Sequence, residues 1–432
     1  MKNVLLTLAV CVFLVAPINA QTHTIEIHQN NRVASLLMEA DEYNNWIVND
    51  QFNNAGIRHA LFQDIYQMFD DDFDFIFLIL NEDERPDNLP FGQLIQVSNA
   101  VQGIGKNIYN NASNYGSDGK LKAVMHLTKR TYLRSGPSLH EVMHNWGNSA
   151  IYTETVSTSG DNLDSFPFQP HWGFTGGSNR GQLGGFDQNS LVENGSNSYT
   201  VDSFGPNANG GNSIPYTEFE LYLMGMIPIT DVTDFDVFTD ITSLTVNTST
   251  FDFVAQGRTT YTSTSLASLL GPRIPSYQDS QKDFKLLVMV LTNTPLTDAQ
   301  WNLLDDHSEK FGRIGSDDAS HTHNFWEATN GLGTMETGNL QDSLGVNDVA
   351  LNDAVKIYPN PTSDELYIEF SEQQNMQSII VYNSLGQQVL YNTLNAYQNT
   401  HSISVRNFPS GLYYIHLKDD KNQVLVKKVV VK

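Results

Sequence analysis

Cysteine is almost absent from this chain of 432 residues, in which Cys11 is the only one. Cys11 lies in a short apolar stretch near the N-terminus, so the rest of the chain can form no disulfide. It must be held together by its core and by any metal it binds. Long apolar runs are also missing. The run from Val4 to Val15 is too short to cross a bilayer, and we expect no transmembrane segment elsewhere.

Basic residues are scarce as well: 24 Lys and Arg stand against 48 Asp and Glu, a formal net charge of −24. Such a chain repels phosphate groups, which argues against nucleic acid and anionic membranes as partners. Residues 355–432 contain seven basic and six acidic residues, so the negative excess lies before them. Calcium is therefore a candidate ligand. Asp70, Asp71, Asp72 and Asp74 could bind it, although a solvated loop is the simpler interpretation.

The order of segments predicts four parts. Residues 1–20 have the positive start, apolar centre and small-residue end of a signal peptide, with cleavage after Ala20. Residues 21–337 are expected to form one large domain, and the polar residues 338–354 a linker. Residues 355–432 alternate between apolar and polar positions and contain turn signals, which predicts a small antiparallel β-sandwich.

The most informative motif is His-Glu-Val-Met-His at residues 140–144. On a helix, His140 and His144 lie four residues apart on one face and can bind one metal ion. Glu141 is then placed to take a proton from a metal-bound water. Ser135 or Ser138 can cap the start of this helix. A helix with two histidines satisfied inside the protein is the plain alternative.

Two candidates remain for the third metal ligand. The metzincin pattern would put a histidine at position 150, where this chain has Ala150. His171, within the Gly- and Asn-rich segment 152–216, is the favoured candidate. Glu220, on a helix predicted from Tyr216 to Gly225, is the second, and Glu218 points elsewhere on that helix. We expect the segment 152–216 to be a loop that walls the cleft.

Other residues could contribute, although plain packing is the simpler interpretation for each. Tyr216 or Tyr222 could donate to an oxyanion. Met224 and Met226, near the end of the same predicted helix, could line the metal site from below. His321 and His323, beside acidic residues, could bind a second metal.

Buried strands are predicted at 73–81, 122–127 and 283–292, where apolar residues run without interruption. Thr297 followed by Gln300 predicts a capped helix over 297–311. In the last part of the chain, period-2 alternation predicts strands at 365–370, 378–382, 388–391, 400–405, 411–418 and 423–431.

The end of the chain resembles the C-terminal sorting domain of the type IX secretion system. The matching motifs are Tyr-Pro-Asn-Pro at 358–361, Val-Tyr-Asn-Ser-Leu-Gly-Gln at 381–387, Pro-Ser-Gly-Leu-Tyr at 409–413 and the basic end from Lys427. The resemblance implies that residues 355–432 are the partner of the secretion machinery. It also implies export through the periplasm to the medium or to the outer-membrane surface.

The residues around the motif at 140–144 are similar to secreted bacterial peptidases of the zincin superfamily. The similarity extends to His171-Trp172-Gly173 and to the residues 221–228. It implies an α+β zincin-like catalytic domain followed by the small antiparallel β-sandwich. It further implies a Zn²⁺ ion held by His140 and His144, with Glu141 as general base. His171 is the favoured third ligand, and Glu220 remains the alternative.

The sequence therefore predicts a secreted zinc-dependent endopeptidase that acts on a protein or peptide. A catalytically silent surface protein that binds or adheres through the same scaffold is the alternative. An enzyme acting on a non-peptide amide, such as a glycan-linked one, also remains open.

Overall fold

The computed structural model describes most of the chain after residue 22. The predicted signal peptide and most of the predicted linker lie outside the described residues. The described ranges are 23–155, 166–167, 171–206, 208–317, 319, 321–343, 355–370, 376–383, 387–394, 400–419 and 424–432.

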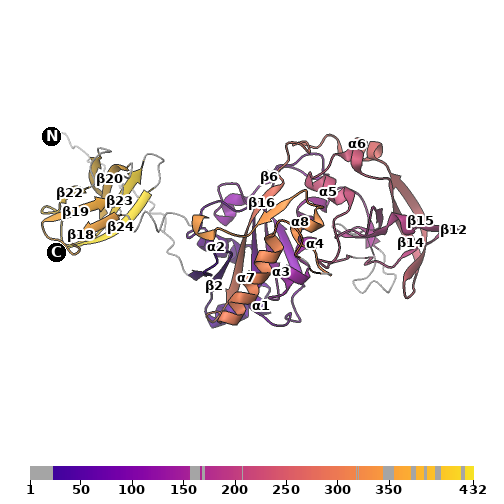
Figure 1. The fold of residues 1–432 in the computed structure, drawn as a ribbon, viewed down its shortest axis with the longest axis horizontal. Coiled ribbons are helices and arrows are strands. Elements are labelled where there is room, and N and C mark those ends of the chain that lie inside the picture. Colours follow the sequence, from indigo (N-terminus) through magenta and orange to yellow (C-terminus); the bar gives the residue numbers. More distant parts are fainter. Residues whose placement is uncertain are drawn as a thin grey trace, which may run out of the picture.

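A seven-stranded sheet forms the centre of the larger part of the chain (Figure 1). Its path runs β1-β2-β16-β3-β7-β4, and β17 pairs with β16. The inner strands are parallel, whereas β1 and β4 are antiparallel to their neighbours. The bounds are β1 Thr24–Ile27, β2 Val33–Leu37, β3 Phe75–Leu80, β4 Gly92–Gln96, β7 Ala123–Leu127, β16 Asp283–Thr292 and β17 Thr334–Glu336. The three buried strands predicted from apolar runs are confirmed as β3, β7 and β16.

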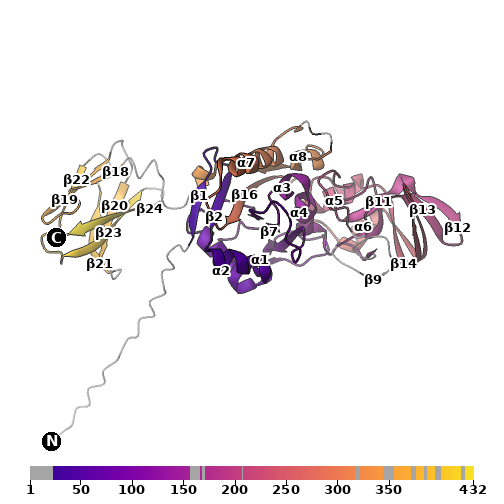
Figure 2. The same cartoon turned by 90° about the horizontal axis from the view of Figure 1, so that it is seen from below.

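The continuous apolar run of β3 has a clear physical cause, because both faces of the sheet are covered. Phe75, Phe77 and Ile79 belong to one hydrophobic cluster, and the alternate residues of β3 belong to another. The first cluster includes residues of α4 (Ser138–Gly147), α5 (Glu218–Met224) and α7 (Asp298–Gly312); the second includes residues of α1 (Ala40–Val48) and α2 (Ala55–Ile65). Figure 2 shows α1 and α2 on one side and α7 on the other.

The helix predicted with a cap at Thr297 is confirmed as α7, where Thr297 and Gln300 form a reciprocal cap. The helix predicted from Tyr216 to Gly225 is confirmed as α5, and Thr217 caps it in the same way with Glu220. Gly225 ends α5 with a positive φ of 86°, a conformation that glycine adopts without strain.

A six-stranded sheet, not expected from the sequence, stands beside this layer. Its order is β11-β10-β14-β15-β13-β12, and its core is rich in phenylalanine, including Phe174, Phe238 and Phe253. The bounds are β10 Gly173–Gly177, β11 Gly184–Asp187, β12 Val192–Gly195, β13 Ser198–Asp202, β14 Phe235–Val246 and β15 Thr250–Tyr261. Four of these strands come from the segment 152–216, which was expected to be a loop.

Glycine explains why these strands were missed. The strand β10 reads Gly-Phe-Thr-Gly-Gly, and every one of its residues is buried. A Cβ atom on Gly173 would lie 1.6 Å from the carbonyl oxygen of Glu154, so the backbone approaches more closely than any side chain allows. Glycine is a poor strand former by propensity, and here close packing overrides that preference.

The predicted fold class, an α+β zincin-like domain followed by a small β-sandwich, is therefore wrong. Strands make up 37% of the structure and helices 24%, and they are distributed over several sheets. The error arises from strands that are short, glycine-rich or half-exposed, because such strands lack the apolar runs that revealed β3, β7 and β16.

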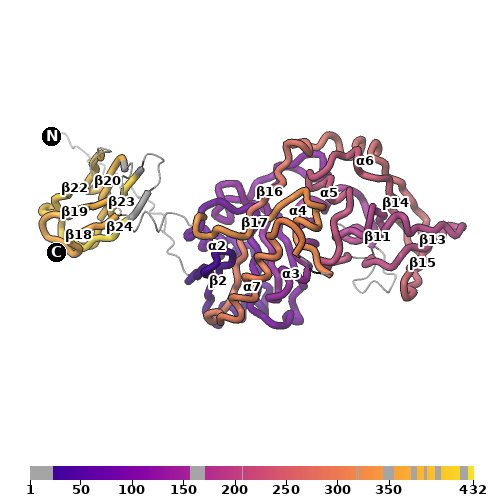
Figure 3. Tube along the Cα trace, viewed as in Figure 1, coloured from indigo at the N-terminus to yellow at the C-terminus, as the bar shows by residue number. Residues whose placement is uncertain are grey.

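The last part of the chain forms two antiparallel sheets, one of three strands and one of four. Figure 3 shows these strands gathered in a unit of their own. The six predicted strands are present, and β18 is an additional one that pairs with β19. The bounds are β18 Val355–Tyr358, β19 Glu365–Phe370, β20 Met376–Asn383, β21 Gln388–Thr393, β22 Thr400–Ser404, β23 Gly411–Asp419 and β24 Val424–Val431.

The packed region before this unit extends further than predicted. Residues Leu340–Ser343 form a 3-10 turn, and Leu340 is fully buried in the cluster with α1 and α2. The Ser343 hydroxyl bonds with Lys285 and Asp72. The first residues of the predicted linker 338–354 are thus part of the larger body.

His126 on β7 makes this core sensitive to acid. It is fully buried, accepts a hydrogen bond on Nε2 from Trp46 at 3.2 Å, and stacks on Phe52. Burial lowers the pKa of His126 to about 3. Since the unfolded chain binds this proton near pH 6.5, His126 costs stability as the pH falls from 6.5 toward 3.

We predict that His126→Gln, which keeps an acceptor for Trp46, loses less stability than the wild type between pH 7 and pH 5. The difference should be about 2 kcal/mol, from roughly 1.4 kcal/mol per pH unit. Urea unfolding of the mature chain at both pH values measures it. Other buried histidines titrate in both proteins and cancel. Equal losses in the two proteins would contradict this account.

Candidate metal centre

The helix α4 carries the motif at 140–144 and is fully buried along its length. Neither Ser135 nor Ser138 caps it. Instead, Asn212 reaches from a distant part of the chain, and its side-chain oxygen accepts a hydrogen bond from the Leu139 amide at 3.1 Å. At the other end, Gly147 is the last helical residue, and Leu183 occupies the space that a Cβ would need there. Both ends of α4 are therefore fixed by the segment 182–212.

His140 and His144 present their Nε2 atoms to each other at 3.1 Å. Their Nδ1 atoms are held from behind: the Gln182 carbonyl lies 2.6 Å from Nδ1 of His140, and the Asn148 side-chain oxygen lies 2.8 Å from Nδ1 of His144. Because these oxygens only accept, each Nδ1 carries the proton and each Nε2 has a free lone pair. The two imidazoles are thus set in the form that binds a metal.

The structure brings His171 to the same place. Its ring centre lies 5.2 Å from the ring centres of both His140 and His144. One ligand atom from each of the three histidines lies within 4.8 Å of the other two. The next residue, Trp172, anchors this position, because its indole donates to the Gly147 carbonyl at 3.2 Å and its amide to the Leu183 carbonyl at 2.7 Å.

The donor set fits zinc. Three imidazole nitrogens and one open position are the usual arrangement of catalytic zinc, with Zn–N distances of about 2.0–2.1 Å. A tetrahedral site of that size places ligand nitrogens roughly 3.3 Å apart, close to the 3.1 Å between His140 and His144. Burial lowers the pKa of His140 to about 4 and that of His144 well below its usual value, which favours the neutral, ligating form.

Glu220, the second candidate for the third ligand, lies elsewhere. Its buried carboxylate accepts three backbone hydrogen bonds, from Leu183 at 2.9 Å, Gln182 at 3.2 Å and Thr217 at 2.8 Å. It therefore holds the Gln182–Leu183 peptide whose carbonyl orients His140. The Thr217–Glu220 spacing of a capping box could have suggested this use of the carboxylate. Glu218, the weaker candidate, accepts from Thr233 instead.

Glu141 is 7% exposed and lies against the edge strand β4. Burial raises the pKa of its carboxyl to about 8, and a hydrogen bond from the Leu94 amide opposes that shift. Gly92 makes the close approach possible, because a Cβ there would lie 2.9 Å from the Glu141 carboxylate. The glutamate is thus beside the histidines in sequence and fixed by β4.

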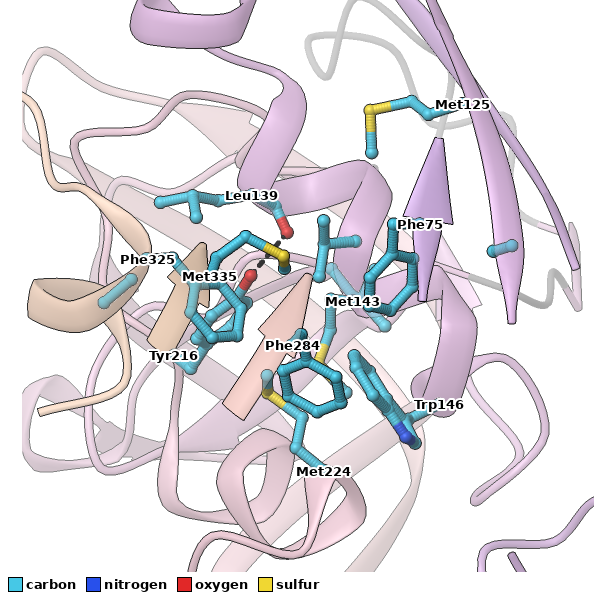
Figure 4. Packing of buried hydrophobic residues seen from close by; sticks show 14 of the residues in the cluster. Phe75, Met125, Leu139, Met143, Trp146, Tyr216, Met224, Phe284, Phe325 and Met335 are labelled. Carbon is cyan, nitrogen blue, oxygen red and sulfur yellow. Dashed lines mark hydrogen bonds between the residues drawn. The ribbon is translucent and has the colours of Figure 1, made fainter. Parts of the chain in front are cut away.

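The other candidates take structural roles. The Tyr216 hydroxyl donates to the Leu139 carbonyl at 2.8 Å, as Figure 4 shows, so it braces α4. Met224 and Met226 are buried in the hydrophobic cluster with Trp146 and Phe284. Burial raises the pKa of Tyr222, which is 4% exposed.

At both proposed accessory metal sites, acidic residues form ion pairs with basic side chains. Asp317, next to His321 and His323 in sequence, forms an ion pair with Arg134. Asp72 pairs with Lys285 and Lys120, and Asp74 pairs with Lys122 at 3.4 Å. Lysine charges therefore neutralise two of the four carboxylates that could have bound calcium.

Comparison with known proteins matches one part of the chain to a family. Residues 356–432 match the family model described as "Secretion system C-terminal sorting domain". β-agarase A of Zobellia galactanivorans is 28% identical over 95 residues, which are 21% of this chain and 17% of that protein. The chain thus spans less than a fifth of the length of this curated relative.

Two solved structures share short regions with the chain. A DUF3244 family protein from Bacteroides vulgatus, with an immunoglobulin-like β-sandwich, covers 18% of this chain and 85% of its own, at 16% identity and a TM-score of 0.17. The BSP domain of a biofilm-associated protein covers 22% of this chain and 19% of its own, at 22% identity and a TM-score of 0.16.

None of the helices in the described part of the chain is long and apolar enough to cross a membrane. The motifs at 358–361, 381–387 and 409–413 fall within the matched region. Residues 356–432 are therefore a type IX secretion C-terminal sorting domain, and the chain is a secreted or cell-surface-attached protein.

Proposed function

We propose that this chain is a secreted zinc-dependent hydrolase that cleaves peptide bonds, with His140, His144 and His171 as metal ligands. The convergence of three imidazoles within 4.8 Å carries the proposal. Two of them are oriented by acceptors on Nδ1, as metal-binding histidines usually are. A zinc ion in such a site would supply a bound water of lowered pKa and polarise a carbonyl oxygen.

The protein's own groups then have distinct tasks. The charge of a bound zinc would favour the ionised form of Glu141. Glu141 then takes a proton from the attacking water and delivers it to the nitrogen of the leaving amine. The Leu94 amide, on the edge strand β4, holds the Glu141 carboxylate in place. Gln182 and Asn148 keep the histidine lone pairs directed inward. The side chains of His140, Glu141 and His144 are buried. Their burial excludes bulk water, which strengthens each of these interactions.

A surface protein that binds or adheres without turnover is the second candidate. The observation that favours it is burial: His140, Glu141 and His144 are only 5%, 7% and 8% exposed. A metal held there would be purely structural. The sorting domain supports both candidates equally, since secretion places no demand on catalysis. Zinc content and turnover, measured on the same protein, distinguish them.

The affinity of the chain for zinc should depend on His171 more than on Glu220. We predict that His171→Ala lowers zinc affinity by more than the ~10–100-fold that loss of an outer partner costs. Glu220→Gln, which disturbs the peptide behind His140, should fall within that range. Competition with a chromogenic chelator measures both. Unchanged affinity in His171→Ala would remove His171 from the ligand set.

Catalysis should depend on Glu141 alone among the acidic groups of the site. We predict that Glu141→Gln lowers casein cleavage by at least ~100-fold, the usual contribution of a general base, and keeps one zinc per chain. The wild type should lose activity to a chelator and regain it with zinc. Zinc without any turnover in the wild type would instead support the binding protein.

Export should depend on the sorting domain. We predict that a chain lacking residues 355–432 stays within the cell envelope, whereas the full chain reaches the surface or the medium. Immunoblots of the cell, surface and medium fractions measure this. A reporter protein placed between residues 1–20 and residues 338–432 is the reciprocal control and should be exported. Equal export of the truncated chain would contradict this role.

A further inference from the structure

A cavity separate from the candidate metal centre lies near the C-terminal end of α4. It has a volume of about 290 Å³, and the described residues that line it include none of the three histidines or Glu141. Trp146, Phe284 and Met224 form its apolar side, and Figure 4 shows these three side chains near one another. The rings of Trp146 and Phe284 are 5.7 Å apart. A small ligand with an apolar group would find a preformed wall here.

Two buried polar atoms in this cavity have no partner among the described residues. Asn145 is 4% exposed, and its side-chain oxygen accepts no hydrogen bond; the Nε atom of Arg273 donates none. Buried polar groups are nearly always paired, because an unpaired one loses its hydration without replacement. Asn145 and Arg273 both line the same cavity. The unpaired Nε donor of Arg273 therefore points to a ligand that carries an acceptor atom.

The positive charge of Arg273 indicates that the ligand is negatively charged. Within the described part of the chain, the other nitrogens of Arg273 donate only to neutral oxygens: Pro275 at 2.6 Å, Leu223 at 3.3 Å and the Ser280 hydroxyl. Lys122, the other cation lining the cavity, is paired with Asp74. Burial lowers the pKa of Arg273 to about 10, so the guanidinium remains charged at neutral pH. A half-buried arginine that lacks an acidic partner attracts an anion.

We propose that this cavity binds a small organic carboxylate with an apolar or aromatic group. The carboxylate would accept hydrogen bonds from the Arg273 guanidinium, and the apolar group would pack on Trp146 and Phe284. Arginine favours carboxylates because its planar fork matches their two oxygens. Asp279, an exposed residue lining the same cavity, limits the affinity by repelling the anion.

The test is calorimetric titration of the full mature chain with 3-phenylpropionate, and with neutral 3-phenylpropionamide as the matched probe. We expect saturable binding of the carboxylate at one site, and binding of the amide at least ~10-fold weaker. A charged hydrogen bond contributes a factor of that order or more. No saturable binding of 3-phenylpropionate, or equal binding of the two probes, would overturn the proposal.

Three variants assign the binding to this cavity. Arg273→Gln should weaken 3-phenylpropionate binding at least ~10-fold, and Asp279→Asn should strengthen it. Asn145→Asp keeps the side-chain size and adds a repelling charge, so it should also weaken binding. It serves as the second test if Arg273→Gln fails to fold. The same affinity in Asn145→Asp and Asp279→Asn as in the wild type would place the ligand elsewhere. None of these outcomes depends on zinc or on peptide cleavage.

Discussion

The buried carboxylate of Glu220 is the interaction on which the candidate site depends. It joins the start of α5 to the Gln182–Leu183 peptide through three backbone hydrogen bonds. That peptide then orients His140 through the Gln182 carbonyl, and the Leu183 carbonyl accepts from the Trp172 amide, next to His171. One carboxylate therefore supports two of the three histidines. Such buried networks are stable only when every member is paired, which explains why so much of this region is held by backbone groups.

The sequence revealed those parts of the molecule whose local pattern agrees with their final environment. The strand β3 is covered on both faces and has a continuous apolar run. The helix α5 has its capping box and terminal glycine in the chain itself. His140 and His144 are four residues apart, so their spacing on one helix was sufficient to predict that their side chains lie together, as they do.

The remaining parts depend on contacts that no local pattern contains. The strand β10 is rich in glycine because its backbone packs against Glu154, and the sequence alone suggested a loop. Asn212 caps α4 from a distant segment, where two nearby serines had seemed sufficient. From the sequence, His171 was the favoured third ligand and Glu220 the second candidate. The structure places His171 beside His140 and places Glu220 behind it. The overall fold class failed for the same reason, since the strands β10 to β13 in the segment 152–216 had no local signal.

The central claim is that His140, His144 and His171 hold one zinc ion with an open position. X-ray absorption at the zinc edge of the mature chain tests it most directly, because the spectrum reports the number and type of ligand atoms. The account predicts one zinc per chain with three imidazole nitrogens at about 2.0–2.1 Å and one oxygen. A chain that binds no zinc, or a shell made of oxygens alone, would contradict it.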